Sequence, residues 1–162
     1  MPSEIITKCS ALIASRGWNI AFVESATAGR LCSEFALTPD SGKILRGGIS
    51  CYEVFVKEQI LNIPHKLIEL YTPESEEVTA ALAHQGAKFF NSKITVAITG
   101  LTTPGGSEAP EKPVGTMFLN IRTPLGIIAD KTIFKGAPEQ IILQASDRAA
   151  QLIYQQLKNN YK

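Results

Sequence analysis

Apolar and polar residues follow two different periods along this chain, and each period predicts one kind of element. From Ile5 to Ile13 the apolar residues recur with the spacing of one helix face, with Ser3 as the N-cap, and Gly17 ends the pattern. The same spacing predicts further helical segments over about 27–37, around 56–61, from 64 to 70 and from 75 to 89. A last helix opens at Pro138 with an apolar face of Ile142, Ala145, Ala149, Leu152 and Ile153.

Short continuous apolar runs predict the strands. Residues 19–24 and 94–99 have the pattern of buried strands, and 48–52 form a shorter one. Residues 115–122 and 127–134 are joined by the turn sequence Thr123-Pro124-Leu125-Gly126, which predicts an antiparallel hairpin. Alternating helices and strands with one hairpin predict an α/β protein, a three-layer α/β/α sandwich around a mixed, mostly parallel sheet. We expect a single domain over 1–162, with a loop over 38–42.

Composition narrows the classes of function. The chain has 162 residues, 44% of them hydrophobic and 19% charged, with a net charge of +1, so electrostatics favours neither nucleic acid nor an anionic membrane as a partner. No apolar run approaches the ~18 residues of a membrane span. Three scattered cysteines, Cys9, Cys32 and Cys51, match neither a disulfide framework nor a metal site. The first residues lack a signal peptide pattern, so we expect a cytoplasmic protein.

Two segments of small and hydroxyl-bearing residues follow buried strands and are the most informative feature for function. They are Ser25-Ala26-Thr27-Ala28-Gly29 and the stretch from Thr99 to Ser107. Ligands of open α/β sheets bind beyond the carboxyl ends of the strands. The two segments therefore predict a polar pocket with a candidate nucleophile.

Ser25 is either that nucleophile or an ordinary N-cap of the helix that follows. A serine nucleophile needs a base, and both histidines, His65 and His84, lie in segments with the pattern of helical surface. Lys57 is the alternative base, because a desolvated lysine can be neutral near pH 7, and Tyr52 could assist it as a hydrogen-bonding phenol. Otherwise Lys57 is a solvated charge on a helix face.

Two segments that contain paired glycines also allow two interpretations. The loop Pro104-Gly105-Gly106-Ser107 and the segment Arg46-Gly47-Gly48 could cradle an anion with backbone N–H groups, or they could be ordinary turns. Neither has the pattern of an ATP or NAD site, so we expect no cofactor.

Several of these segments together resemble the CinA C-terminal domain family, the nicotinamide-mononucleotide deamidases. The resemblance rests on Glu24-Ser25 with Thr27 and Gly29, Gly47-Gly48, Tyr52 with Lys57, Thr99-Gly100, Pro104-Gly105-Gly106, and Lys112-Pro113-Val114-Gly115-Thr116. It implies hydrolysis of the carboxamide of a nucleotide, with Ser25 as nucleophile, Lys57 as base and Tyr52 in support. It also implies a homo-oligomer and a substrate site at Thr27, Gly29, Arg46, Gly47, Gly48, Thr99, Gly100, Pro104, Gly105 and Gly106.

The chain departs from the family pattern at three places. Ala28 replaces a glycine in a turn where we expect a positive φ or a close approach of substrate. Glu53-Val54 replaces two small polar residues, and Pro138 replaces an arginine that would suit a phosphate. Other cations that could take its place are Arg30, Lys43, Arg46, Lys112 and Lys135.

Three hypotheses follow. The first is an amidohydrolase that acts on nicotinamide mononucleotide by a serine–lysine mechanism. The second, which the departures motivate, is a nucleotide-binding relative without amidase activity. The third is a structural or oligomerising protein in which the loops are only turns.

Overall fold

A five-stranded open sheet organises the protein, whose computed structural model describes residues 1–160. The strand order is β2-β1-β3-β4-β5. The strands are β1 (Ile20–Glu24), β2 (Leu45–Ser50), β3 (Ile94–Gly100), β4 (Thr116–Thr123) and β5 (Gly126–Ile133). β1 pairs in parallel with β2 and β3, whereas β4 runs antiparallel to both β3 and β5. The predicted mixed sheet and the β4–β5 hairpin are confirmed.

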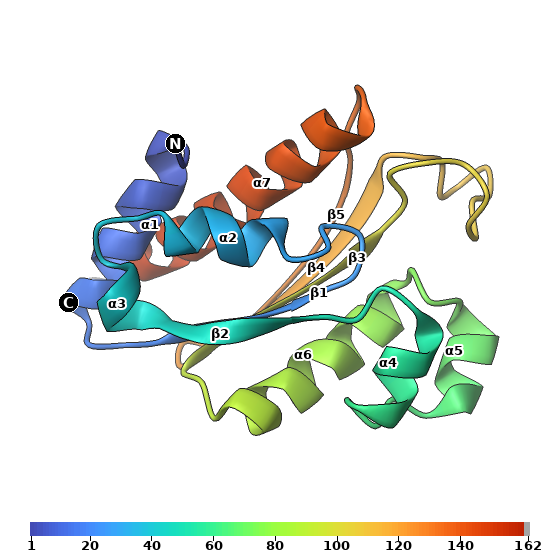
Figure 1. Ribbon diagram of the computed structural model, residues 1–162, viewed down its shortest axis with the longest axis horizontal. Helices are drawn as coiled ribbons and strands as arrows, with labels where there is room; N and C mark the ends of the chain where they lie inside the picture. Colours follow the sequence, from blue (N-terminus) through green and yellow to red (C-terminus); the bar gives the residue numbers. More distant parts are fainter. Residues whose placement is uncertain (161–162) are drawn as a thin grey trace.

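Helices cover both faces of the sheet, as the three-layer prediction requires (Figure 1). One layer contains α1 (Glu4–Ser15), α2 (Arg30–Ala36) and α7 (Pro138–Asn159). The opposite layer contains α4 (Val54–Gln59), α5 (His65–Tyr71) and α6 (Glu76–Phe90). The short helix α3 (Ser41–Ile44) lies between α2 and β2 in the chain.

Each face of the sheet has its own apolar core. Phe22 of β1 packs in the core under α1, α2 and α7, and the next residue, Val23, packs in the core under α4, α5 and α6. Successive side chains of a strand point to opposite faces, so a strand buried on both sides must be apolar throughout. This constraint explains why the run at 20–23 stands out in the sequence.

Local capping fixes two helix starts at the predicted residues. The Ser3 hydroxyl accepts the Ile6 N–H, and the Ser75 hydroxyl accepts the Val78 N–H, so both helices begin directly after an N-cap serine.

The structure corrects the sequence prediction at three other places. Residues 41–44 form α3 inside the segment that we expected to be a loop. The buried face of α7 starts at Ile141 and not at the predicted Ile142. Ile142 and Leu152, both expected on that face, are only half-buried. β2 begins at Leu45, three residues earlier than predicted, because pairing with β1 extends the strand through two glycines that hide its apolar pattern.

The order of the strands creates a switch point at β1. The chain leaves β1 for β2 on one side and later returns as β3 on the other. Crevices at such points are the usual ligand sites of open α/β sheets. The two segments that the sequence singled out therefore emerge side by side. Within residues 1–160, no helix is long and apolar enough to cross a membrane.

Gly86 tests the packing of α6 on the sheet. A Cβ at this position would lie 2.4 Å from Val23 Cγ2. We expect Gly86→Ala to lower the free energy of unfolding by about 1–3 kcal/mol in urea denaturation, because the helix must move off the sheet. Gly42→Ala is the control, since nothing lies within 4 Å of its added methyl group. Equal stabilities of the two variants would contradict this packing.

Candidate active site

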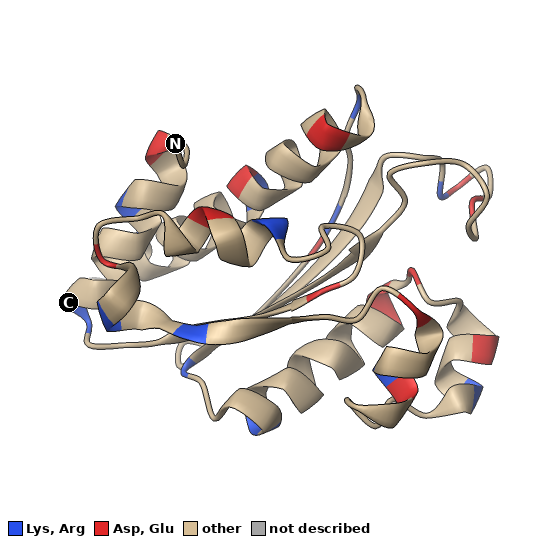
Figure 2. Ribbon diagram, in the orientation of Figure 1, with Lys and Arg blue, Asp and Glu red and all other residues tan. Residues whose placement is uncertain are grey.

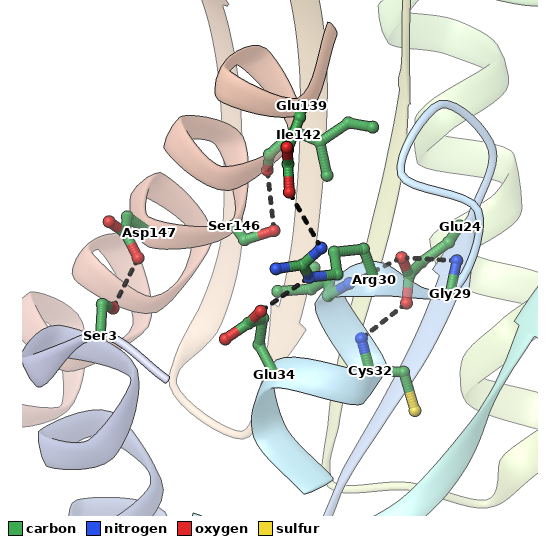
Figure 3. Close-up of polar contacts among 11 residues, drawn as sticks. Ser3, Glu24, Gly29, Arg30, Cys32, Glu34, Glu139, Ile142, Ser146 and Asp147 are labelled. Carbon is green, nitrogen blue, oxygen red and sulfur yellow. Dashed lines mark hydrogen bonds and ion pairs between the residues drawn. The ribbon is translucent and has the colours of Figure 1, made fainter. Parts of the chain in front are cut away.

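A buried carboxylate at the end of β1 shapes the turn that carries Ser25. Glu24 is fully buried, and its Oε2 accepts hydrogen bonds from Thr27 Oγ1 at 2.5 Å and from the N–H groups of Gly29 and Leu31 at 3.0 Å. Its Oε1 accepts the Cys32 N–H at 2.8 Å (Figure 3). The carboxylate thus satisfies N–H groups of the first turn of α2, which have no partner inside the helix. This cap explains why α2 begins at Arg30 instead of near Thr27.

The turn itself needs left-handed backbone. Ala28 has a φ of +48° and Gly29 a φ of +95°, and the Ala28 N–H donates to the Ser25 carbonyl. The expectation of a positive φ at Ala28 is confirmed. An alanine in this conformation is strained, because its Cβ approaches the backbone.

Ser25 and Lys57 meet at the floor of a pocket, although 32 positions separate them in the chain. Lys57 Nζ lies 3.0 Å from Ser25 Oγ. It also donates to the carbonyl oxygens of Cys51 at 2.5 Å and Tyr52 at 3.2 Å. Lys57 is 1% exposed and Ser25 is 5% exposed, so the pair is shielded from bulk water.

Burial controls the protonation of the lysine. Removal from water lowers the pKa of Lys57 from its ordinary value, and the negative charge of Glu74 opposes this shift in part. A neutral amine has two N–H bonds and one lone pair. The ammonium form donates to both carbonyl groups and to Ser25 Oγ, whereas in the neutral amine the two N–H bonds serve the carbonyl groups and the lone pair can accept the Ser25 hydroxyl. This is the arrangement of a general base next to a nucleophile.

A pocket of about 210 Å³ opens above this pair. It is lined by Ser25, Ala26, Tyr52, Glu74 and residues 100–106. Among the residues expected to bind substrate, Gly100, Pro104, Gly105 and Gly106 lie here. The Tyr52 side chain is 64% exposed at the rim, and only its carbonyl group contacts Lys57.

The structure does not bring the other expected substrate-binding residues to this pocket. Thr27 and Gly29 are engaged by Glu24, and the buried Thr99 hydroxyl bonds to that of Thr79. Arg46 is exposed on the edge strand β2, where it donates to the Asn91 carbonyl.

Packing accounts for the two glycines next to Arg46. An added Cβ at Gly47 would lie 3.4 Å from the Phe90 ring, and one at Gly48 would lie 3.0 Å from Cys32 Sγ. The glycine pair therefore lets β2 pack closely, and neither glycine lines the pocket.

None of the five cations considered for a phosphate lines this pocket either. Arg30 pairs with Glu34 and Glu139, as Figure 3 shows, and Lys43 pairs with Asp40. Within the described residues, no group of three or more histidine, cysteine or acidic side chains could hold a metal ion.

Sequence reasoning missed two acidic residues at this site. Glu24 carried part of the resemblance but received no role, although an acidic residue that ends a buried strand signals a carboxylate with local N–H partners. Glu74 lies between α5 and α6, and no pattern in its neighbourhood connects it to Ser25.

The fold and the site together define an open-sheet α/β protein with a serine–lysine pair at the switch point of its sheet. The chain belongs to the CinA family, because residues 3–157 match the model of the CinA C-terminal domain.

Curated relatives are longer proteins. A CinA-like protein of Desulfotalea psychrophila is 34% identical over 129 residues, which cover 80% of this chain and 31% of that protein. A CinA-like protein of Leptospira biflexa is 37% identical over 143 residues, covering 87% of this chain and 34% of that protein. The chain thus spans about a third of the length of these relatives.

Solved structures support the fold. A CinA superfamily protein from Klebsiella pneumoniae superposes with a TM-score of 0.90 at 22% identity, covering 96% of this chain and 97% of that one. The competence/damage-inducible protein CihA of Agrobacterium tumefaciens gives 0.87 at 20% identity, covering 96% and 98%.

Replacing Glu24 tests its role in the turn. We expect Glu24→Gln to lower the free energy of unfolding by about 2–3 kcal/mol in urea denaturation, because the amide NH₂ group would face N–H donors. The control is Glu139→Gln, whose side chain is 74% exposed and 3.6 Å from Arg30, and we expect it to change stability by less than ~0.5 kcal/mol. A Glu24→Gln variant as stable as this control would refute the role.

Proposed function

We propose that this protein is an amidohydrolase that uses Ser25 as nucleophile and Lys57 as general base. The observation that supports it is the 3.0 Å contact between a serine hydroxyl and a buried lysine at the floor of a pocket. Following the family resemblance, we take nicotinamide mononucleotide as the substrate to test first, with nicotinate mononucleotide and ammonia as products.

The reaction begins with acylation of the serine. Lys57 Nζ takes the proton of Ser25 Oγ while the oxygen forms a bond to the carboxamide carbon of the substrate. The resulting lysine ammonium protonates the amide nitrogen as the C–N bond breaks, and ammonia leaves. Lys57 is then neutral again and removes a proton from the water that hydrolyses the acyl-enzyme. The lysine ammonium returns this proton to Ser25 Oγ as the bond between Oγ and the acyl carbon breaks, so the acid product leaves and the Ser25 hydroxyl is restored.

Backbone N–H groups can stabilise the oxyanion of the tetrahedral intermediate. The N–H groups of Ser25, Ala28 and Gly29 are already used, by the Ile98 carbonyl, the Ser25 carbonyl and Glu24. Those of Ala26 and Thr27 have no hydrogen-bond partner within residues 1–160. Ala26 lines the pocket and directly follows the nucleophile, so we assign its N–H to the oxyanion. A donor of this kind contributes a factor of ~10²–10³ to kcat.

Removal of the nucleophile gives a direct test. We expect Ser25→Ala to reduce ammonia release from nicotinamide mononucleotide at least ~10³-fold without unfolding the protein. Ser33→Ala, which removes an exposed serine of α2, should retain full activity. Full activity of Ser25→Ala would refute the proposal. Thermal stabilisation of the wild type by the nucleotide without any ammonia would favour the non-hydrolysing relative instead.

The pH dependence tests the base. Because burial lowers the pKa of Lys57, we expect kcat/KM to rise with pH along an acid limb whose midpoint lies below ~10.4, the ordinary lysine pKa. At pH values between the lowered pKa of Lys57 in the folded protein and its ordinary pKa in the unfolded chain, the unfolded chain binds more protons than the folded one. The free energy of unfolding therefore also rises with pH in this range.

Matched variants assign these effects to one residue. In Lys57→Met the acid limb and the extra rise in stability should both disappear, whereas Lys66→Met, which removes an exposed lysine of α5, should retain them. Rate profiles and urea denaturation between about pH 7 and 10 measure both quantities. An acid limb that persists in Lys57→Met would exclude this lysine as the base.

A further inference from the structure

The long connection between β3 and β4, residues 101–115, forms one wall of the pocket, and we call it the arm. Its first part, up to Gly106, belongs to the pocket lining. In Figure 2 the arm projects from the end of the sheet and carries both acidic and basic residues. Within residues 1–160, no backbone–backbone hydrogen bond reaches residues 102–108. Contacts other than strand pairing must therefore hold this wall in place.

One lysine ties the arm to the connection between α5 and α6. Lys112 Nζ donates to Ser107 Oγ and to Thr72 Oγ1, each at 2.7 Å. It also donates to the carbonyl oxygen of Glu74 at 2.9 Å. These three acceptors use all three N–H bonds of an ammonium group, so the cation is committed to joining the two segments. We call the four residues that take part, Thr72, Glu74, Ser107 and Lys112, the clasp.

The clasp reaches the pocket through Ser107. The Ser107 hydroxyl donates to Glu74 Oε2, and Glu74 lines the pocket. Ser107 also directly follows Gly106, where the arm leaves the pocket lining. Gly105 has a φ of +101°, and nothing lies within 4 Å of a Cβ added to it. Hydrogen bonds, rather than packing, therefore fix this end of the wall.

The other end of the clasp has a strained backbone. Thr72 has a φ of +70° and a ψ of 158°, a conformation that a β-branched residue rarely adopts. Its N–H donates to the Ile68 carbonyl at 2.8 Å, and its own carbonyl accepts the Ser75 hydroxyl at 2.9 Å. Strain of this kind persists where surrounding contacts enforce it, and it is concentrated at functional sites. Here it occurs at the residue whose hydroxyl accepts a hydrogen bond from Lys112.

We propose that Lys112 is a positioning residue, which through the clasp holds residues 101–106 in place as the wall that binds the ligand of this pocket. This inference rests on the proposed function and adds to it a residue remote from the reacting atoms. Within residues 1–160, no hydrogen bond joins Lys112 to Ser25 or to Lys57. Loss of the clasp should therefore weaken substrate binding and leave the chemical step intact.

Kinetics separate positioning from a merely structural role. Lys112→Met keeps an unbranched side chain and removes the ammonium group. We expect it to raise KM for nicotinamide mononucleotide about tenfold and to leave kcat within about twofold of the wild type. If Lys112 only stabilised the fold, a smaller fraction of active molecules would lower the apparent kcat at an unchanged KM. That result would overturn the proposal.

A second lysine on the same arm provides the matched control. Lys131 Nζ donates to the Glu111 carbonyl at 3.1 Å, and neither residue belongs to the pocket lining. Lys131→Met should therefore retain the KM and the kcat of the wild type. A rise in KM as large as that of Lys112→Met would contradict a specific role of the clasp.

Proteolysis tests the clasp without catalytic activity and without any change in the sequence of the arm. Thr72→Val removes the hydroxyl that Lys112 contacts, whereas Thr72→Ser retains it. Glu108 is exposed on the arm, so a glutamate-specific protease can cut after it when the arm is released. Because such cleavage follows the population of the open form, we expect Thr72→Val to be cut about tenfold faster than the wild type. Thr72→Ser should be cut at about the wild-type rate.

The two measurements distinguish failure of this inference from failure of the proposed function. Equal cleavage rates of Thr72→Val and Thr72→Ser would refute the clasp, whether or not the protein is a hydrolase. If the wild type releases no ammonia and the two variants differ as expected, the role of the clasp in holding the wall is supported and only the proposed hydrolysis fails.

Discussion

The site depends on one buried carboxylate that forms no ion pair within residues 1–160. Glu24 is fully removed from water in the fold, and the four donors that surround its carboxylate offset the loss of hydration. Those donors belong to the turn after β1 and to the first turn of α2. The carbonyl group of Glu24 also accepts the Cys51 N–H, at 2.7 Å. One residue thus orders the turn that presents Ser25 and the backbone that receives Lys57.

Burial of Lys57 connects stability to chemistry. An amine out of water destabilises the folded protein whenever it is protonated, and the same desolvation lowers the pKa of Lys57, so the neutral amine that the proposed reaction needs forms at a lower pH than for an exposed lysine. Glu74 acts in the opposite direction, because its negative charge favours the ammonium form.

Sequence reasoning was most accurate where one local signal decides the structure. The apolar run at 20–23 and the serine caps at Ser3 and Ser75 are such signals, and the corresponding elements were predicted. Lys57 was assigned as the alternative to two histidines in helical-surface patterns, together with the family resemblance. For the glycines at 47 and 48 the sequence left open an anion cradle or ordinary turns, because the neighbours that require them, Phe90 and Cys32, come from other parts of the chain. Glu74 could not be found for the same reason, since only the tertiary fold places it on the pocket.

The position of β2 at the edge of the sheet has a consequence for how the proposed activity could be lost. The carbonyl groups that hold the lysine amine directly follow β2, and this strand pairs with β1 alone. Edge strands separate more readily than central ones, because only one ladder of hydrogen bonds retains them. Local fraying there would withdraw the proton acceptor while the apolar layers stay packed. Inactivation of such a molecule can thus precede its melting.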